Sequence, residues 1–299
     1  MKVLLTGGSG FLGRHALHAL AQTGVEIVGT YLHEPGPARQ GVTWRRCDLL
    51  DKDATAALVR RTRPSHLLHM AWRPVYGDVA NARDNIDWLK ASLDLAAEFI
   101  DAGGERIVGA GTCLEYDRSS EPCDEALTPL APATTYGACK HALRAALDGM
   151  ARASGVSFAW ARIFFSYGPG EHETRFIAYL ARSLLRGEPA EMTSGQQVRD
   201  YTYAGDIGEA LALLVQSAHV GEFNVGSGSN AALREIALEL AHQIGRPELL
   251  RLGAKPNRAY EAPVIVADLD KTVATLGWRP RTPLRVGLAE TIEMLRARG

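Results

Sequence analysis

A glycine-rich turn near the start of the chain constrains its fold more than any other stretch. Residues 2–5 form an apolar run of strand length, and the apolar positions within 14–20 recur with helical spacing. Between these segments, Gly8, Gly10 and Gly13 match the pattern Gly-x-Gly-x-x-Gly. Glycine permits a sharp turn and a close approach to a pyrophosphate, and the amino end of the following helix favours negative charge. The order of strand, turn and helix predicts a dinucleotide-binding unit; the alternative is a glycine-rich turn that only joins two core elements.

Composition excludes several classes of protein. With 299 residues, 46% of them apolar, the chain can bury a full core, while a net charge of −1 and the lack of a basic block argue against nucleic-acid binding. No run of about eighteen apolar residues and no leader-like opening is found, so we expect a cytoplasmic protein without a membrane partner. Four scattered cysteines, without the close pairing of a zinc or redox site, predict reduced thiols and no metal centre.

Strand-like and helix-like segments alternate along the first half of the chain. The expected strands are residues 2–5, 25–31, 42–49, 65–71 and 106–111, and the expected helices begin after the glycine turn and cover 52–61, 85–102 and the stretch after 136. This alternation predicts an α/β fold with a doubly wound parallel sheet. Parallel sheets carry their binding groups at the carboxyl ends of the strands, so the residues that follow these strands are the candidates for a site.

The end of the second expected strand bears on the choice of cofactor. An acid about twenty residues beyond the glycines would bind the ribose 2′-hydroxyl and repel a 2′-phosphate, but Tyr31 stands there and Glu34 is the only carboxylate nearby. His33 and Arg39 follow in a loop where a cation could meet a phosphate. This pattern favours NADP over NAD; the alternative is a solvated loop with an incidental His and Arg.

The other strand ends complete the expected cofactor site. Asp48 could accept a hydrogen bond from the adenine amino group, or it is a simple loop acid. The predicted cofactor contacts from the glycine turn and the strand ends are Gly7, Gly10, Phe11, Leu12, Gly13, Tyr31, His33, Arg39, Asp48, Leu49 and Ala71.

Three residues form a candidate catalytic set. Tyr136 and Lys140 are four apart, so on a helix they share one face, and Thr112 ends the strand that precedes them. A phenol titrates near 10, and a nearby ammonium would lower that value and let the tyrosine exchange a proton with a substrate hydroxyl or ketone. The hydroxyl of Thr112 would hold the same oxygen, while a nicotinamide gives or takes hydride.

Taken together, these motifs resemble the extended short-chain dehydrogenase/reductase family of nucleotide-sugar epimerases, dehydratases and reductases. Nearly the whole chain takes part in the resemblance, through the segments 6–13, 68–71, 112–116, 167–170, 197–201, 223–228 and 276–280 together with Asn85, Tyr136 and Lys140. It implies a Rossmann domain at 1–165 and a smaller α/β substrate domain at 166–299, some segments of which return to the first. It also implies that Asn85, Tyr136 and Lys140 contact the cofactor.

The same resemblance implies a substrate and an assembly. Arg199 and Arg258 match the family's diphosphate-binding arginines, Arg175 matches less closely, and a guanidinium can bind phosphate oxygens through two parallel hydrogen bonds. The alternative for each is a surface ion pair. The expected partner is therefore a nucleotide-diphosphate sugar, in contact with Thr112 as well. A homodimer is also implied, with residues 86–100 and 136–153 of each subunit in a four-helix bundle.

Departures from the family's pattern favour one reaction. Its dehydratases and sugar-acid decarboxylases carry a glutamate where Leu114 stands, and Glu115 on a strand would point the other way. Phe165 replaces the asparagine of galactose-type 4-epimerases. With the missing acid at Tyr31, these differences predict a 4-ketoreductase acting on an NDP-4-keto-6-deoxyhexose. The alternatives are an NAD-dependent nucleotide-sugar 4-epimerase and, from another class, a non-catalytic NAD(P)-sensing module.

Overall fold

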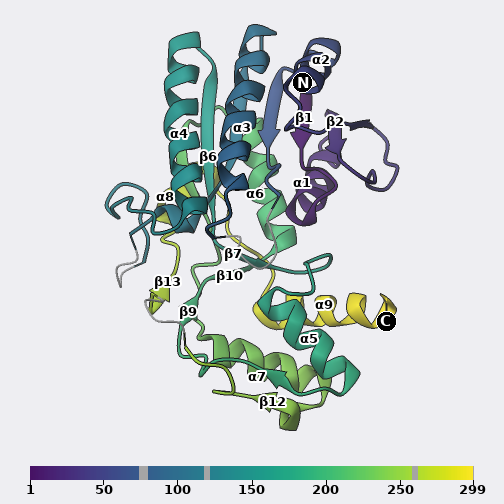
Figure 1. The fold of residues 1–299 in the computed structure, drawn as a ribbon, viewed down its shortest axis with the longest axis vertical. Helices are drawn as coiled ribbons and strands as arrows, with labels where there is room; N and C mark the ends of the chain where they lie inside the picture. The colour runs from purple at the N-terminus through teal and green to yellow at the C-terminus, as the bar shows by residue number, and fades with distance from the viewer. Residues whose placement is uncertain (74–79, 118–121, 258–261, 299) are drawn as a thin grey trace.

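The centre of the fold is a parallel β-sheet. The computed structural model describes residues 1–73, 80–117, 122–257 and 262–298. The strands of the central sheet are β1 (Lys2–Thr6), β2 (Glu26–Tyr31), β3 (Val42–Arg46), β4 (His66–His69), β5 (Arg106–Thr112), β6 (Ser157–Ile163) and β11 (Gly221–Val225). In the described residues these seven strands pair in the order β11-β6-β5-β4-β1-β2-β3, each parallel to its neighbours. The order reverses at β1, which confirms the predicted doubly wound sheet (Figure 1).

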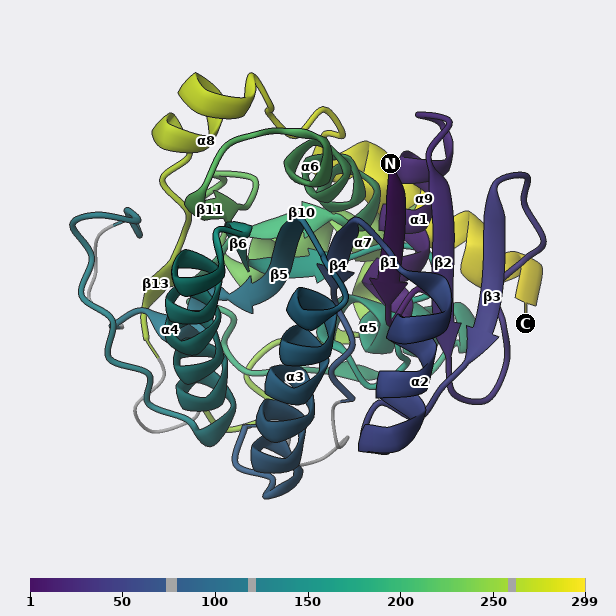
Figure 2. The same ribbon diagram turned by 90° about the horizontal axis from the view of Figure 1, so that it is seen from above.

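Helices cover both faces of the sheet because neighbouring strand residues point to opposite sides. Val3 and Leu5 pack against α1 (Phe11–Ala21) and α6 (Ala204–Gln216), whereas Leu4 contributes to the core beneath the other helices. Those helices are α2 (Lys52–Thr62), α3 (Asp84–Asp101) and α4 (Thr135–Ser154). Seen from above, α3 and α4 lie side by side in front of the sheet, with α1 and α6 behind it (Figure 2).

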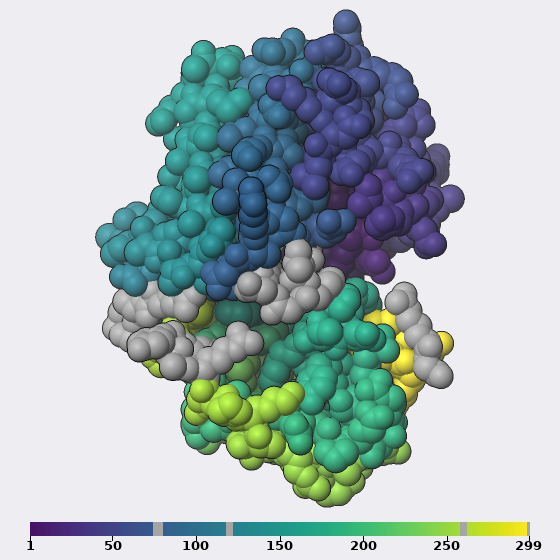
Figure 3. Space-filling model, viewed as in Figure 1, coloured from purple at the N-terminus to yellow at the C-terminus, as the bar shows by residue number. Residues whose placement is uncertain are grey.

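A second, smaller group of elements has its own core. Helices α5 (Phe176–Arg186), α7 (Leu233–Ile244) and α9 (Leu284–Arg298) meet around Leu180, Leu240 and Leu288. The remaining elements are β7 (Phe165–Tyr167), β8 (Ala190–Glu191), β9 (Val198–Arg199), β10 (Tyr201–Tyr203), β12 (Leu250–Arg251), β13 (Val264–Ile265), α8 (Asp270–Leu276) and the 3₁₀ turns η1 (Cys113–Glu115) and η2 (Pro247–Leu249). In the space-filling view the group around α5, α7 and α9 forms the lower part of the molecule (Figure 3).

The two parts of the chain are interleaved. Strand β11 and helix α6 come from the second half of the sequence, yet β11 is the edge of the central sheet and α6 packs on α1. The division at residue 165 therefore stays a prediction, with these segments as the ones that return to the first part. Strand β3 is shorter than expected and ends at Arg46, because the chain then turns into the cap of α2, where the Asp51 carboxylate accepts from the Ala54 amide at 3.0 Å.

The glycine turn joins β1 to α1 through a very close backbone approach. Gly7 has a φ of +69°, a conformation that favours glycine, and a Cβ on Gly13 would lie 1.9 Å from the carbonyl oxygen of Gly7. No real contact is that short. Gly13 therefore lets the first turn of α1 sit directly on the end of β1, and this places the amino end of the helix at the carboxyl edge of the sheet.

Replacing Gly13 with alanine should break this approach. We expect Gly13→Ala to lower the free energy of unfolding by about 2 to 4 kcal/mol, because backbone rather than a flexible side chain must move. Gly149 is the matched control: it lies inside α4, and an added Cβ there would meet nothing within 4 Å. Gly149→Ala should raise stability by about 1 kcal/mol. Urea unfolding of both variants measures the difference, and equal effects would contradict this account.

Candidate active site

A cavity of about 670 Å³ opens along the carboxyl edge of the sheet. It begins at the glycine turn, passes the ends of β2, β4 and β5, and reaches the first turns of α4 and the segment before α5. The predicted site residues that line it are Gly7, Gly10, Phe11, Leu12, Gly13, Tyr31, His33, Asp48, Leu49, Ala71, Thr112, Tyr136, Lys140 and Arg175. Most of the residues chosen from the sequence therefore meet in one place.

The three candidate catalytic residues come from β5 and α4. Thr112 is the last residue of β5, and α4 starts beside it with the hydroxyl of Thr134 accepting from the Gly137 amide at 3.1 Å. A Cβ on Gly137 would lie 2.4 Å from the carbonyl oxygen of Leu114, so this glycine lets the helix approach the strand end closely. As a result Tyr136 and Lys140, one helical turn apart, both face the cavity beside Thr112.

Lys140 is buried and held by two groups. Its ammonium Nζ donates to the carbonyl oxygen of Ala110 at 2.9 Å and lies 4.0 Å from the centroid of the Trp72 ring. The indole of Trp72 is fixed in turn by a 2.9 Å hydrogen bond from Nε1 to Asn85 Oδ1. Burial lowers the pKa of Lys140 to about 7, against the opposing charge of Glu115. Near neutral pH the charged and neutral forms of this amine are therefore close in free energy.

The pKa of Tyr136 departs from the sequence-based expectation. Burial raises it to about 12, with the nearby Cys113 and Glu115 acting in the same direction, while a hydrogen bond with Thr112 and the charge of Arg175 oppose the rise. The predicted net lowering of this pKa by Lys140 is wrong for this structure, because burial has the larger effect, and the ammonium donates to Ala110 and lies against the Trp72 ring. The phenol is thus held protonated, as a proton donor must be.

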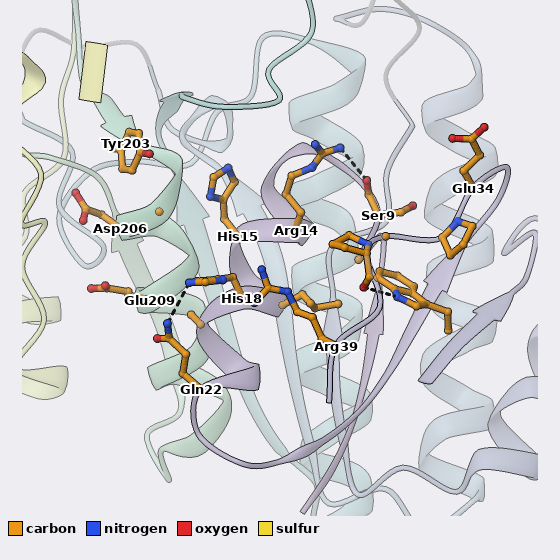
Figure 4. A pocket seen from close by; sticks show the side chains of 18 of the residues that line it. Ser9, Arg14, His15, His18, Gln22, Glu34, Arg39, Tyr203, Asp206 and Glu209 are labelled. Atoms are coloured by element: carbon orange, nitrogen blue, oxygen red, sulfur yellow. Dashed lines mark hydrogen bonds between the residues drawn. The ribbon is translucent and has the colours of Figure 1, made fainter. Parts of the chain in front are cut away.

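The end of the cavity next to β2 contains Tyr31, His33 and Asp48, but not Arg39. Arg39 lines a second cavity of about 770 Å³ behind the glycine turn, together with Glu34 and residues of α1 and α6 (Figure 4). Ser9 lines both cavities. The structure therefore separates His33 and Arg39, which the sequence grouped as phosphate ligands, and leaves His33 at the end of β2.

Two further predicted contacts lie behind the cavity rather than on its wall. Asn85 is buried and holds Trp72, and its amide donates to the carbonyl oxygen of Ala82 at 2.8 Å. Arg199 is also buried: its guanidinium lies 5.7 Å from the Phe165 ring centroid and donates to the carbonyl oxygen of Val198 at 2.8 Å. Phe165 itself lines the cavity. Arg258 lies outside the described residues.

Arg175 is the predicted substrate cation that does reach the cavity. It precedes α5, and its Nε donates to Glu171 Oε1 at 3.2 Å. Burial raises the pKa of Glu171 to about 7, and Arg175 opposes this. Sequence reasoning gave no role to Trp72, Arg73 or His172, which also line the cavity. Their only signal in the sequence is position, since the first two follow the end of β4 and the third follows the Tyr-Gly-Pro-Gly segment.

Neither a metal centre nor a membrane-spanning helix is found among the described residues. Among the described residues, no group of three or more His, Cys, Asp or Glu side chains is arranged to hold a metal ion. The four cysteines are free and buried. Across the described part of the chain, the helices lack the length and apolar character needed to span a bilayer.

Comparison with known proteins relates this geometry to a family. The model of the NAD dependent epimerase/dehydratase family matches residues 3–226. CDP-abequose synthase of Salmonella typhimurium is 24% identical over 98% of this chain and 98% of its own length. UDP-glucuronic acid decarboxylase 6 of Arabidopsis thaliana is 26% identical over 100% of this chain and 90% of its own. The structure of UDP-glucose 4-epimerase of Thermus thermophilus with NAD is 28% identical, has a TM-score of 0.89 and covers 99% of both chains.

Replacing Lys140 with methionine should stabilise the protein while damaging the site. The folded-state pKa of about 7 lies below the ordinary 10.5, so the buried ammonium costs stability fully below pH 7, and this cost shrinks as pH rises towards 10.5. We expect Lys140→Met to gain on the order of 2 to 4 kcal/mol at pH 6 and progressively less above pH 7. The exposed Lys90 on α3 is the control, and Lys90→Met should show no such gain. Thermal unfolding across this pH range tests the slope; a gain independent of pH would contradict it.

Proposed function

Because the chain belongs to the NAD dependent epimerase/dehydratase family, we propose that this enzyme reduces a 4-keto nucleotide sugar with NADPH. The observation that carries the proposal is the composition of the cavity around Thr112, Tyr136 and Lys140. Among the described residues that line it, the one carboxylate is Asp48, at the cofactor end. Leu114 lines the wall beside Thr112, where the family's dehydratases and decarboxylases carry an acid. A ketoreduction needs only the proton donor that Tyr136 supplies.

The residues of the glycine turn fit a nicotinamide dinucleotide. Gly10 and Gly13 keep this turn tight, since Cβ atoms on them would lie 3.1 and 1.9 Å from the carbonyl oxygen of Gly7. The amino end of α1 follows directly and favours the charge of a pyrophosphate. When bound, the cofactor supplies the hydride for carbon 4 of the sugar. Asp48 and Leu49 would hold the adenosine end, and Tyr136 and Lys140 the nicotinamide end.

Each catalytic residue has one task in this proposal. The hydroxyl of Thr112 donates to the carbonyl oxygen of the substrate and holds it beside the phenol of Tyr136. Tyr136 gives its proton to that oxygen as the carbonyl is reduced. Lys140, when charged, would offset part of the cost of the phenolate that remains, from one helical turn away. The burial that raises the pKa of Tyr136 to about 12 makes this stabilisation necessary, because an unpaired phenolate in a buried site is costly.

For the substrate we propose a nucleotide diphosphate carried by Arg175. Its guanidinium lines the cavity and its charge acts on Tyr136, and Glu171 orients it through the 3.2 Å hydrogen bond. Arg199 would support the same region from behind Phe165. The diphosphate role of Arg258 stays a prediction.

A homodimer is part of the same proposal. Helices α3 and α4 lie side by side on one face of the sheet, as a four-helix bundle between two subunits requires (Figure 2). Ile86, in the first turn of α3, is an exposed apolar residue that such a bundle would cover.

The second candidate function is a nucleotide-sugar 4-epimerase. It is favoured by the similarity to the Thermus thermophilus UDP-glucose 4-epimerase, whose structure contains NAD. An epimerase oxidises and re-reduces the same carbon, so it retains its nicotinamide through the cycle. Protein that releases bound NAD after denaturation, and that interconverts epimers without added cofactor, would support this function over reduction.

The reductase proposal is tested by following nicotinamide absorbance. Purified protein with NADPH and a panel of dTDP-, CDP- and GDP-4-keto-6-deoxyhexoses should consume NADPH with at least one of them. Tyr136→Phe should lower kcat about 10²- to 10⁴-fold, because the variant lacks the proton donor, while NADPH still binds. No loss of absorbance with any sugar, from protein that binds NADPH, would overturn the proposal.

Cofactor choice can be tested at the end of β2. We expect His33→Ala to weaken NADPH binding on the order of tenfold and to leave NADH binding unchanged, because only NADPH carries the 2′-phosphate. Arg39→Ala is the control, since Arg39 lines the other cavity, and its effect should be smaller. Dissociation constants from nicotinamide fluorescence measure both. A larger loss of NADPH affinity in Arg39→Ala would assign the 2′-phosphate contact to Arg39. Equal losses of NADPH and NADH affinity would argue against NADP preference.

A further inference from the structure

A buried carboxylate lies three residues after Thr112 and has no part in the chemistry proposed above. Glu115 ends the short turn η1 and is 0% exposed. Its Oε1 accepts the backbone amide of Thr112 at 2.9 Å and the indole Nε1 of Trp160 at 3.0 Å. The Thr112 hydroxyl in turn accepts the Leu114 amide at 3.3 Å, which completes a capping box. Glu115 thus fixes the backbone that carries the catalytic hydroxyl.

Glu115 lies away from the cavity wall formed by Leu114, as predicted, but for a different reason. Strand alternation was expected to turn it away from Leu114, whereas the structure has a 3₁₀ turn at residues 113–115. Gly111 makes room for the carboxylate: a Cβ there would lie 2.6 Å from Glu115 Oε1 and 2.2 Å from Trp160 Nε1. The end of β5 is therefore built around Glu115.

Lys140 holds the same strand end through a different residue. Its ammonium donates to Ala110, while Glu115 accepts from Thr112, so both charged groups are bonded to the last three residues of β5. The negative charge of Glu115 acts directly on Lys140 and opposes the fall of its pKa. Of the described acidic groups, Glu115 is the one whose charge acts on this ammonium.

Other titratable groups surround Glu115 and Lys140. Arg162 of β6 places Nε 3.4 Å from Glu115 Oε2, and the two side chains are 1% and 0% exposed. From α4, Tyr136 and His141 also sense the charge of Glu115. On the far side of Lys140, burial and the ammonium lower the pKa of His69 to about 3, so this imidazole is neutral at neutral pH.

A chain of hydrogen bonds holds Glu115 in place. Arg162 Nη1 donates to the Tyr116 hydroxyl at 3.2 Å, and that hydroxyl donates to Asn224 Oδ1 at 2.8 Å. Asn224 lies on β11 and donates to the carbonyl oxygen of Cys123 at 2.7 Å. A buried ion pair survives only when its remaining hydrogen-bonding groups are satisfied, and this chain satisfies them. Strands β5 and β6 thus contact the carboxylate directly, and β11 supports Arg162 through the Tyr116 hydroxyl.

We propose that Glu115 is a positioning residue of this enzyme, which fixes Thr112 at the end of β5 and supplies a negative charge that acts on Lys140. The inference rests on the proposed function, because it assigns Glu115 to the same three residues. It also accounts for an acid in this motif that does no acid–base work. Removing the charge while keeping the shape should therefore alter the titration of Lys140, which a purely structural residue would not do.

The test is the pH dependence of NADPH and NADH binding in Glu115→Gln. An ammonium holds the anionic cofactor more tightly than a neutral amine, so affinity should fall as pH rises through the pKa of Lys140. Without the Glu115 charge this fall should begin about one pH unit lower. The side-chain oxygen of glutamine can still accept from Thr112 and Trp160, so these contacts at the end of β5 are retained. Glu222→Gln is the matched control, because Glu222 pairs with Arg144 one turn further along α4 and should leave the profile unchanged.

A second variant guards against loss of folding. Glu115→Gln leaves Arg162 without its buried partner, which is destabilising, so the double variant Glu115→Gln with Arg162→Met removes both charges together. It should show the same shift of the binding profile. Profiles that superimpose on the unchanged protein in both variants, or an equal shift in Glu222→Gln, would overturn the proposal.

The binding measurement separates this proposal from the reductase proposal. It requires only that the enzyme binds its nicotinamide cofactor, so it gives an answer even if no 4-keto sugar is reduced. If turnover is found, Glu115→Gln should lower kcat more than it changes KM for the sugar, and its alkaline limb should move to lower pH with the binding profile. A turnover profile that keeps its limb while the binding profile moves would contradict the link between Glu115 and Lys140.

Discussion

The active site depends on keeping a positive charge inside the protein. Lys140 is buried to 3% exposure, and the resulting loss of hydration lowers its pKa to about 7. At that value, small contributions from neighbours decide whether the amine is charged. A carbonyl oxygen, an indole ring and a buried carboxylate act together on the charged form, and each comes from a different segment: Ala110, Trp72 and Glu115. The packing around the end of β5 therefore stabilises the charged form of Lys140.

That support requires the parallel sheet. Because β4 and β5 run side by side in the same direction, Trp72 and Thr112, which follow or end these strands, reach the same edge although 40 positions separate them in the chain. Helix α4 then returns across the sheet and brings Lys140 back to the strand it hydrogen-bonds. The glycine turn after β1 opens onto the same edge. The site is therefore a consequence of the direction of the strands as much as of the identity of its residues.

The sequence predicted what depends on local spacing. The alternation of strands and helices and the four-residue spacing of Tyr136 and Lys140 are local properties, and the structure brings these residues together as expected. The directions in which loop side chains point depend on packing and were not predictable from the sequence. The loop that carries Arg39 folds over Trp44, whose indole donates to the carbonyl oxygen of Pro37 at 3.3 Å, and a Cβ on Gly36 would lie 2.4 Å from its ring. This contact keeps Arg39 away from the cofactor end.

Burial was the second effect that the sequence did not reveal. The expectation for Tyr136 considered the nearby ammonium but not the loss of water around the phenol, and the latter has the larger effect on its pKa. Arg199 shows the same limit: its motif identified a guanidinium suited to phosphate, but not that its charge would pack behind Phe165. Spacing identifies which groups are near one another, whereas solvent exposure, which depends on the whole fold, decides how they titrate.

The position of one carboxylate connects the architecture with the choice of reaction. An acid at position 114 would face the cavity and could serve as a second acid or base, as dehydration requires; here Leu114 takes that place. The acid stands one residue later, where the 3₁₀ turn directs it into the core towards Arg162. The carboxylate of Glu115 therefore lies in the core behind the strand end, whereas Leu114 forms the cavity wall. In that position it accepts from the Thr112 amide and acts on Lys140, and under the proposed reduction Tyr136 is the proton donor of the cavity.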